Sequence, residues 1–340
     1  MNDQDKAKQI QSNWWRWLIE FLFPDKKFDG QLQNPGSERL FDFDDVISSK
    51  NPIAVIRQEI AYYPKGDDKK LFAVFISGLG QRENDSSKRS RRYAATLNTG
   101  VANMNNSSYL KQSPILGIIN PYLDWIDAAV HRLGFSDSPA IENTASLILY
   151  ALNQEIPLNL SGDSHGTILL ARAINRAKRY FIDNYTGVWN FKRRRIREVM
   201  WEQRTKSLIN VFAFGNGYRK WVKGPKYIMV SISGDPLPQR FGITPQRAIK
   251  QRRTDIKFII FERLFPEGSF EAHNMMFTTE LLRHTFVKNN IEVGDFHRLY
   301  YQLKEDVLQL AIPQEMKWSS DIKDYVWSED SLDSIILKKY

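Results

Sequence analysis

Apolar residues along the chain gather in short runs, and stretches with helical spacing lie between these runs. The runs occupy Ile53 to Tyr63, Leu71 to Ser77, Ile115 to Ile119, Leu158 to Ser161, Leu208 to Phe214, Tyr227 to Ser233 and Ile256 to Phe261. Unbroken apolar runs are typical of strands that are buried on both faces of a parallel sheet. We therefore predict a strand at each run, with a turn from Pro64 to Asp67 joining the first two.

The segments between the predicted strands favour helices. They are the helix-prone stretch from Tyr93 to Met104, then Ser138 to Asn153, Thr167 to Ile182 and Phe277 to Lys288. Pro139 suits a first helical turn, so Ser138 or Asp137 is expected to cap the second helix. Strands that alternate with helices indicate an α/β fold, in which helices cover both faces of a mostly parallel central sheet.

We expect three parts along the chain. Residues 1–52 hold an aromatic helix and a loop-rich segment, residues 53–310 form the α/β domain with a basic insertion at about 183–207, and residues 311–340 are a C-terminal extension. The apolar spacing from Ile10 to Phe23 predicts a helix that ends at Pro24. Such a helix either packs over the domain as a lid or brace or lies in a membrane interface.

Composition narrows the class of protein. The 340 residues are 42% hydrophobic and include no cysteine, which allows a sizeable core and excludes disulfides, thiolate chemistry and Cys-ligated zinc. The sequence contains no H-E-x-x-H motif, no His pair at metal spacing and no glycine-rich phosphate loop, so we expect neither a metal nor a cofactor. It shows no signal-peptide pattern and no long apolar run, so we expect a cytoplasmic protein, with peripheral membrane attachment as an alternative.

Positive charge is unevenly distributed. The net charge is +9, and the window from Arg172 to Lys206 holds eleven Lys and Arg against three Asp and Glu. Such a window suits an anionic partner, either a membrane surface, a protein or nucleic acid, and it equally suits a solvated helix face. No RNA-binding signature accompanies it, so nucleic acid is not the expected partner. A second basic cluster, Lys88 to Arg92, is interpreted as a solvated loop, with phosphate or carboxylate binding as the alternative.

The sequence Gly162-Asp163-Ser164-His165-Gly166 lies between a predicted strand and a predicted helix. This order of strand, tight turn and helix is that of a nucleophile elbow, with Ser164 at its apex. Side chains two residues to either side of the serine would crowd such a turn, so glycine is required at 162 and 166.

Other predicted strands also end in residues that suit acyl transfer. Asp235 follows the run that ends at Ser233, and His273 follows the run that ends at Phe261. The chain order Ser164, Asp235, His273 is the order expected for a Ser, acid, His triad. In this assignment His273 is the base, Asp235 orients it, and the oxyanion donors are the N–H of His165 and that of Leu79 or Gly80.

Each triad position has rivals. Asp255, Glu262 and Glu267 are the other candidate acids. Among the histidines, His131 precedes the elbow, His165 is placed wrongly for a base, and His297 lies far toward the C-terminus. His284 is the main rival to His273, but it falls within a predicted helix, whereas loops between strands and helices usually carry function.

Together with the elbow, the segments Val211 to Asn216 and Ser233 to Pro238 make the chain similar to the lipase class 3 branch of the α/β-hydrolases. The resemblance extends from about Leu71 to Leu282. It implies an α/β-hydrolase fold and cleavage of a lipid or another acyl ester. The chain differs from the family at Asp163 and Ser77, where the family usually has histidine.

The sequence therefore predicts a serine hydrolase that cleaves a carboxylic ester through an acyl-enzyme. Thioester hydrolysis and acyl transfer remain open, because they share that intermediate. The alternative is a catalytically silent hydrolase fold that binds nucleic acid or a protein through its basic surface. No feature of the sequence predicts an oligomeric state.

Overall fold

A single twisted sheet organises the protein. The computed structural model describes residues 28–64, 72–78, 83–106, 129, 138–183, 191–263, 270–273, 275–288, 296–303 and 305–311. Within them the strand order is β2 (Leu40–Phe41), β1 (Leu32–Gln33), β4 (Gly100–Met104), β3 (Phe72–Ile76), β5 (Leu158–Asp163), β6 (Ile209–Phe214), β7 (Lys226–Ile232), β8 (Ile256–Phe261) and β9 (Val307–Leu310). Neighbours from β4 to β9 are parallel, and only the edge strands β1 and β2 pair in antiparallel fashion. The predicted α/β class is confirmed.

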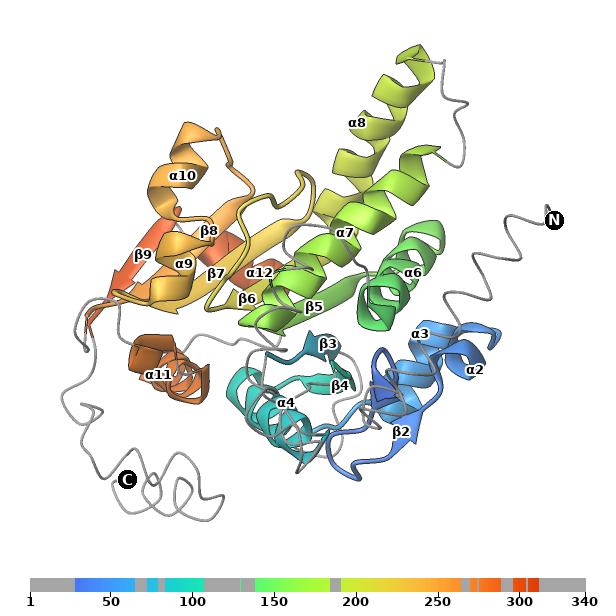
Figure 1. Ribbon diagram of the computed structural model, residues 1–340, viewed down its shortest axis with the longest axis horizontal. Helices are drawn as coiled ribbons and strands as arrows, with labels where there is room; N and C mark the ends of the chain where they lie inside the picture. The colour runs from blue at the N-terminus through green and yellow to red at the C-terminus, as the bar shows by residue number, and fades with distance from the viewer. Residues whose placement is uncertain are drawn as a thin grey trace.

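Helices cover both faces of this sheet (Figure 1). One face carries α6 (Pro139–Asn153), α7 (His165–Asp183) and α8 (Phe191–Leu208), together with α2 (Phe43–Ile47), α3 (Pro52–Val55) and α10 (Pro245–Lys250). The other face carries α4 (Glu83–Leu97), α11 (Met275–Lys288) and α12 (Phe296–Gln302). The short helix α9 (Pro236–Arg240) follows β7, and a 3₁₀ turn at Phe270–His273 precedes α11.

The two helical layers explain why the central strands are mostly apolar on both of their faces. Successive side chains of a strand point to opposite faces. On β6, Val211 and Ala213 pack into the core beneath α7, whereas Phe212 and Phe214 pack into the core beneath α4 and α11. Every residue of β6 is buried, as expected for a strand covered on both faces.

Most predicted elements that fall on described residues are confirmed, but the strand at Ile53 to Tyr63 is wrong. This segment forms α3 and then a π-helical turn at Ile56–Ile60. The Asn51 side chain caps α3 by accepting a hydrogen bond from the N–H of Ala54, and Pro52 starts the helix. Ile53, Ile56 and Ile60 are buried at helical spacing. The strand prediction relied on the β-branched composition of the segment, whereas the spacing of its apolar residues indicates the observed helix.

The helix-prone stretch from Tyr93 to Met104 also divides in the structure. α4 ends at Leu97, Asn98 takes a positive φ of 49°, and β4 begins at Gly100. The segment before Asn51 was expected to be loop-rich, yet it supplies β1 and β2 to the sheet edge. The predicted helix at residues 10–23, the strand at 115–119 and most of the extension at 311–340 lie outside the described residues.

The sheet order indicates where a ligand site is expected. From β3 the chain moves outward to β4 and then returns to the other side of β3 to form β5. Ligand sites in open α/β sheets lie at the carboxyl ends of the strands where the order reverses in this way. Here those ends lead into Ser77 and Ser164. Nowhere in the described helices is there a segment sufficiently long and apolar to cross a membrane.

Candidate active site

Ser164 lies on a strained turn at the reversal point of the sheet. It directly follows β5 and precedes α7, and its φ of 51° is in the left-handed region that residues with a side chain rarely occupy. Strain of this kind is found where surrounding contacts impose it, often at functional sites. The predicted order of strand, turn and helix is therefore present.

Both elbow glycines are required by close packing. A Cβ at Gly166 would lie 2.1 Å from the backbone oxygen of Ile76 on β3, and a Cβ at Gly162 would lie 2.9 Å from the backbone oxygen of Gly166. Neither position has room for a side chain. The absence of side chains lets α7 start directly against the end of β3.

Backbone hydrogen bonds hold the turn in place. The N–H of Ser164 donates to the carbonyl of Phe214 at 3.0 Å, which links the turn to the end of β6. The hydroxyl of Thr167 donates to the carbonyl of Ser164 at 2.6 Å and accepts from the N–H of Gly217 at 3.0 Å. Ser164 is thus fixed to the end of β6 and to the segment that follows it before any substrate is present.

Asp235 and His273 form a buried pair on the other side of the turn. Nδ1 of His273 lies 2.9 and 3.1 Å from the two carboxylate oxygens of Asp235, and the side chains are 14% and 2% exposed. A carboxylate only accepts hydrogen bonds, so Nδ1 carries the hydrogen and donates. Asp235 is itself held as the N-cap of α9, where it accepts from the N–H of Leu237 at 2.9 Å.

This environment changes the basicity of the imidazole. Burial by itself lowers the pKa of His273, but the hydrogen bond and negative charge of Asp235, with a further contribution from Asp163, outweigh burial. The pKa of His273 is therefore raised above its ordinary value. A base of this kind is more easily protonated while a reaction proceeds.

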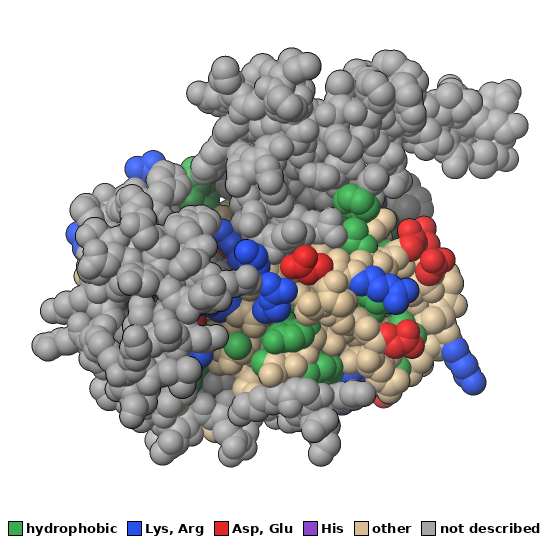
Figure 2. Space-filling view, turned by 90° about the horizontal axis from the view of Figure 1, so that it is seen from below, with side chains coloured by type: hydrophobic (Ala, Val, Ile, Leu, Met, Phe, Trp, Pro, Cys, Tyr) green, Lys and Arg blue, Asp and Glu red, His purple; other side chains and the backbone are tan. Residues whose placement is uncertain are grey.

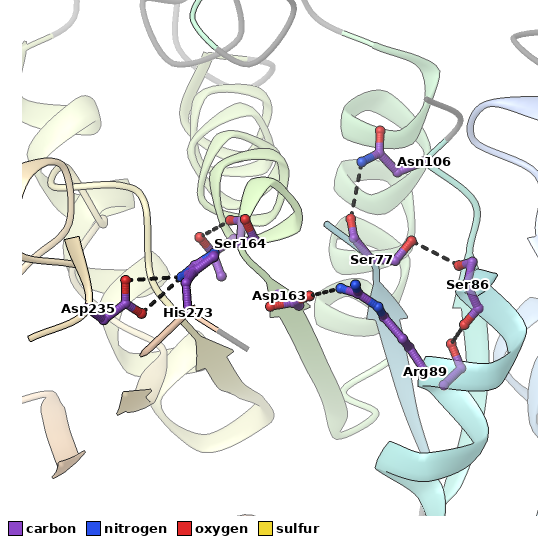
Figure 3. A network of polar contacts seen from close by, with 10 residues as sticks. Ser77, Ser86, Arg89, Asn106, Asp163, Ser164, Asp235 and His273 are labelled. Carbon is purple, nitrogen blue, oxygen red and sulfur yellow. Dashed lines mark hydrogen bonds and ion pairs between the residues drawn. The ribbon is translucent and has the colours of Figure 1, made fainter. Parts of the chain in front are cut away.

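His273 lies between Asp235 and Ser164 in Figure 3. Gly215 lies between the imidazole of His273 and the turn at Ser164. It follows Phe214 and has a φ of 53°. A Cβ there would lie 2.4 Å from Cε1 of His273, so the turn that binds the N–H of Ser164 also touches the imidazole. Nε2 of His273 is buried and makes no hydrogen bond to any described residue. The structure therefore contains no hydrogen bond between this nitrogen and Ser164.

Replacing Gly215 by alanine is expected to displace His273. The added methyl group would collide with the imidazole and would require an unfavourable positive φ. A misplacement of about 1 Å in a catalytic group costs roughly 100-fold in rate, and we expect a loss of that size in kcat. Gly217→Ala is the matched control, because its Cβ would meet Ile168 at an ordinary 3.4 Å. Equal ester turnover by the two variants would contradict the placement of His273.

Of the three predicted oxyanion residues, the structure describes His165. Leu79 and Gly80 lie outside the described residues. His165 is buried at the start of α7, so its N–H belongs to the first helical turn, and its Nδ1 lies 3.3 Å from Nδ2 of Asn106. Nδ2 of Asn106 also donates to the carbonyl of Ser77 at 3.1 Å. Asn106 therefore links the ring of His165 to the residue that follows β3.

An ion pair that the sequence analysis missed lies beside Ser164. Nη1 of Arg89, on α4, donates to Oδ2 of Asp163 at 2.7 Å (Figure 3). Burial raises the pKa of Asp163, and the charge and hydrogen bond of Arg89 oppose this rise. The interpretation of Lys88 to Arg92 as a solvated loop is wrong, because the segment lies in α4 and its arginines are paired.

The other arginines of this cluster contact acidic partners away from the elbow. Nη1 of Arg91 lies 3.5 Å from Oε1 of Glu38, and Nε of Arg92 lies 3.5 Å from Oε1 of Glu280. Figure 2 views the molecule from the side of α4 and α11, and basic and acidic side chains are interspersed on the described part of that surface. This part of the surface is therefore not a patch of a single charge.

The rival residues occupy other positions. Asp255 pairs with Arg253 at 2.7 Å, Glu262 is exposed, and His284 lies within α11, as predicted for that rival. His297 belongs to α12, while Glu267 and His131 lie outside the described residues. Within the described residues, no group of His, Asp and Glu has the arrangement of a metal site.

No protein-family model matches the chain, and no curated protein is significantly similar to it. The candidate site therefore rests on its own geometry.

Proposed function

We propose that the protein is a serine hydrolase of carboxylic esters with an α/β-hydrolase fold. The main support is the contact of the buried Asp235–His273 pair with the turn that holds Ser164 at a positive φ. The resemblance to the lipase class 3 branch favours a lipid or another acyl ester as substrate. In this proposal the side chains required for acyl transfer come from this chain alone.

In the first step, Oγ of Ser164 attacks the ester carbonyl carbon while Nε2 of His273 takes the hydroxyl proton. The negative charge that develops on the carbonyl oxygen is stabilised by N–H groups near the start of α7, where the helix dipole is positive. Asp235 stabilises the imidazolium. When the carbon–oxygen bond breaks, His273 returns the proton to the departing alcohol, and the acyl group remains on Ser164.

In the second step, water replaces the alcohol. His273 takes a proton from the water as its oxygen attacks the acyl-enzyme, and it then protonates Oγ of Ser164 as the acid departs. An alcohol or amine acceptor in place of water would make the enzyme an acyltransferase, and a thiol leaving group would make it a thioesterase. The site is compatible with each of these reactions.

A panel of p-nitrophenyl esters with graded acyl length tests this proposal. We expect saturable turnover, with a burst of p-nitrophenol equal to the enzyme concentration wherever deacylation is the slower step. The dependence of kcat/KM on acyl length then identifies the preferred acyl group. Neither turnover nor a burst with any ester, thioester or activated acyl donor would refute acyl-transfer chemistry.

The alternative function, a binding module, draws support from α8. Residues 193–196 near its start are exposed and include three arginines, and Ile196 and Val199 are 52% and 51% exposed. Leu208 leads directly into β6, while the other end of α8 projects from the sheet (Figure 1). The basic half therefore lies away from the edge that carries Ser164. A membrane bound there would not lie against the active site.

Charge reversal on α8 separates binding from catalysis. We expect Arg193→Glu/Arg194→Glu/Arg195→Glu to leave the turnover of a soluble ester unchanged and to remove flotation with vesicles containing phosphatidylserine. Vesicles of phosphatidylcholine alone are the control for charge-independent adsorption. Equal, negligible flotation of the wild-type protein with both vesicles would contradict the membrane hypothesis and leave an acidic protein or nucleic acid as the anionic partner to test.

A further inference from the structure

The elbow carries a buried carboxylate immediately before the proposed nucleophile. Asp163 ends β5, its side chain is 2% exposed, and among described residues its hydrogen-bond partner is Arg89. Arg89 comes from α4, the helix that follows the proposed oxyanion loop, and its side chain is 23% exposed. The pair thus joins two segments that contribute to the proposed site.

Gly78 shows where this carboxylate lies relative to the reacting atoms. A Cβ built on Gly78 would be 3.0 Å from Cβ of Ser164 and 3.2 Å from Oδ2 of Asp163. The carboxylate is therefore close to both the serine and the start of the oxyanion loop. A negative charge here would repel the oxyanion that forms during acyl transfer, and it would do so strongly because the carboxylate is buried.

We propose that Arg89 is a positioning residue that neutralises Asp163, so that the elbow keeps a carboxylate next to Ser164 without destabilising the oxyanion. The inference rests on the proposed serine chemistry. The ion pair also links α4 to the end of β5. Arg89 in this role acts through Asp163 and does not contact the substrate.

The Arg89–Asp163 ion pair also affects the pKa of the proposed base, His273. The charged groups that act on His273 are Asp235, Asp163 and Arg89, from three different segments of the chain. The charge of Asp163 raises the pKa of His273, and the charge of Arg89 lowers it. Removing either member of the ion pair should therefore shift the protonation of His273, in opposite directions. A role limited to packing would not produce such shifts.

Four variants test this inference. Arg89→Gln leaves Asp163 uncompensated, and we expect it to slow fluorophosphonate labelling and ester turnover by about tenfold or more. Asp163→Asn removes the harmful charge and should stay within a few-fold of wild type, and the double variant should resemble Asp163→Asn. Arg91→Gln is the matched control, because it also removes a positive charge from α4. The Arg91 side chain is 26% exposed, similar to that of Arg89, but its ion-pair partner is Glu38. Its rate should be close to that of the wild type.

The pH profile provides the second measurement. His273 must be neutral to act as a base, so activity falls as the pH decreases through the pKa of His273. The acid limb should move to higher pH in Arg89→Gln and to lower pH in Asp163→Asn. Thermal unfolding of each variant confirms that the protein remains folded.

Two kinetic results would overturn the inference. One is an equal effect of Arg89→Gln and Arg91→Gln on rate and pH profile. The other is a double variant no faster than Arg89→Gln. NMR titration of the His273 ring, assigned with His273→Gln, tests the charge balance even if the wild-type protein has no ester activity. Unchanged titration in Arg89→Gln would then refute it, whereas absent activity alone refutes only the proposed function.

Discussion

Replacing Ser164 by alanine is expected to abolish ester hydrolysis and the burst of alcohol release. The acyl-enzyme needs the hydroxyl oxygen, and neither His273 nor Asp235 can replace it at the apex of the turn. We expect only the residual rate that binding and oxyanion stabilisation provide, about 10³ to 10⁴ above the reaction in water. Steady-state turnover of the best ester in the panel measures this loss.

Ser161→Ala is the matched control for Ser164→Ala. Ser161 lies on β5, the strand that leads into Ser164, and its hydroxyl donates to the carbonyl of Phe212 at 2.9 Å in the buried sheet. Losing this hydrogen bond should cost about 1 kcal/mol of stability and leave turnover near that of wild type. Substantial turnover by purified Ser164→Ala, or an equal loss in both variants, would contradict the assignment of the nucleophile.

Replacing Asp235 by asparagine should lower kcat by roughly 10⁴-fold at neutral pH. The carboxylate accepts from Nδ1 of His273, which leaves the lone pair on Nε2. An amide can donate to Nδ1 instead, which favours the tautomer with its hydrogen on Nε2, and it cannot stabilise the imidazolium. The protein should remain folded, because asparagine also caps a helix well and α9 keeps its N-cap.

Asp255→Asn provides the comparison for Asp235→Asn. Asp255 is the acid that pairs with Arg253 after β7, and it was a rival candidate in the sequence. Its substitution should lower the melting temperature without a large change in kcat. If turnover fell in Asp255→Asn and persisted in Asp235→Asn, the acid would be wrongly assigned.

The sequence was most informative where one local rule determines structure. Central strands such as β6 are buried at every position and mostly apolar because both faces are covered, so they could be predicted without knowing their neighbours. Gly162 and Gly166 could be interpreted because only glycine fits a turn that brings α7 so close to β3. In the same way, Asp235 and His273 were candidates because each follows a predicted strand.

The sequence was least informative where structure depends on distant segments. Arg89 and Asp163 are 74 positions apart, and nothing in their local patterns shows that they meet. The two-residue strands β1 and β2 are too short for an alternating pattern, so their pairing with β4 was not predictable. The segment from Pro52 to Ile60 was mispredicted for a local reason. Its isoleucine content suggested a strand, although its buried positions have helical spacing.

The most direct test of the central claim is mapping of a fluorophosphonate adduct on the wild-type protein by mass spectrometry. We predict one adduct, on the peptide that contains Ser164, formed faster as the pH rises through the pKa of His273. Prior heat denaturation should prevent it, because the turn and the Asp235–His273 pair exist only in the folded protein. Absence of an adduct, or an adduct on another residue with Ser164 unmodified, would contradict the account.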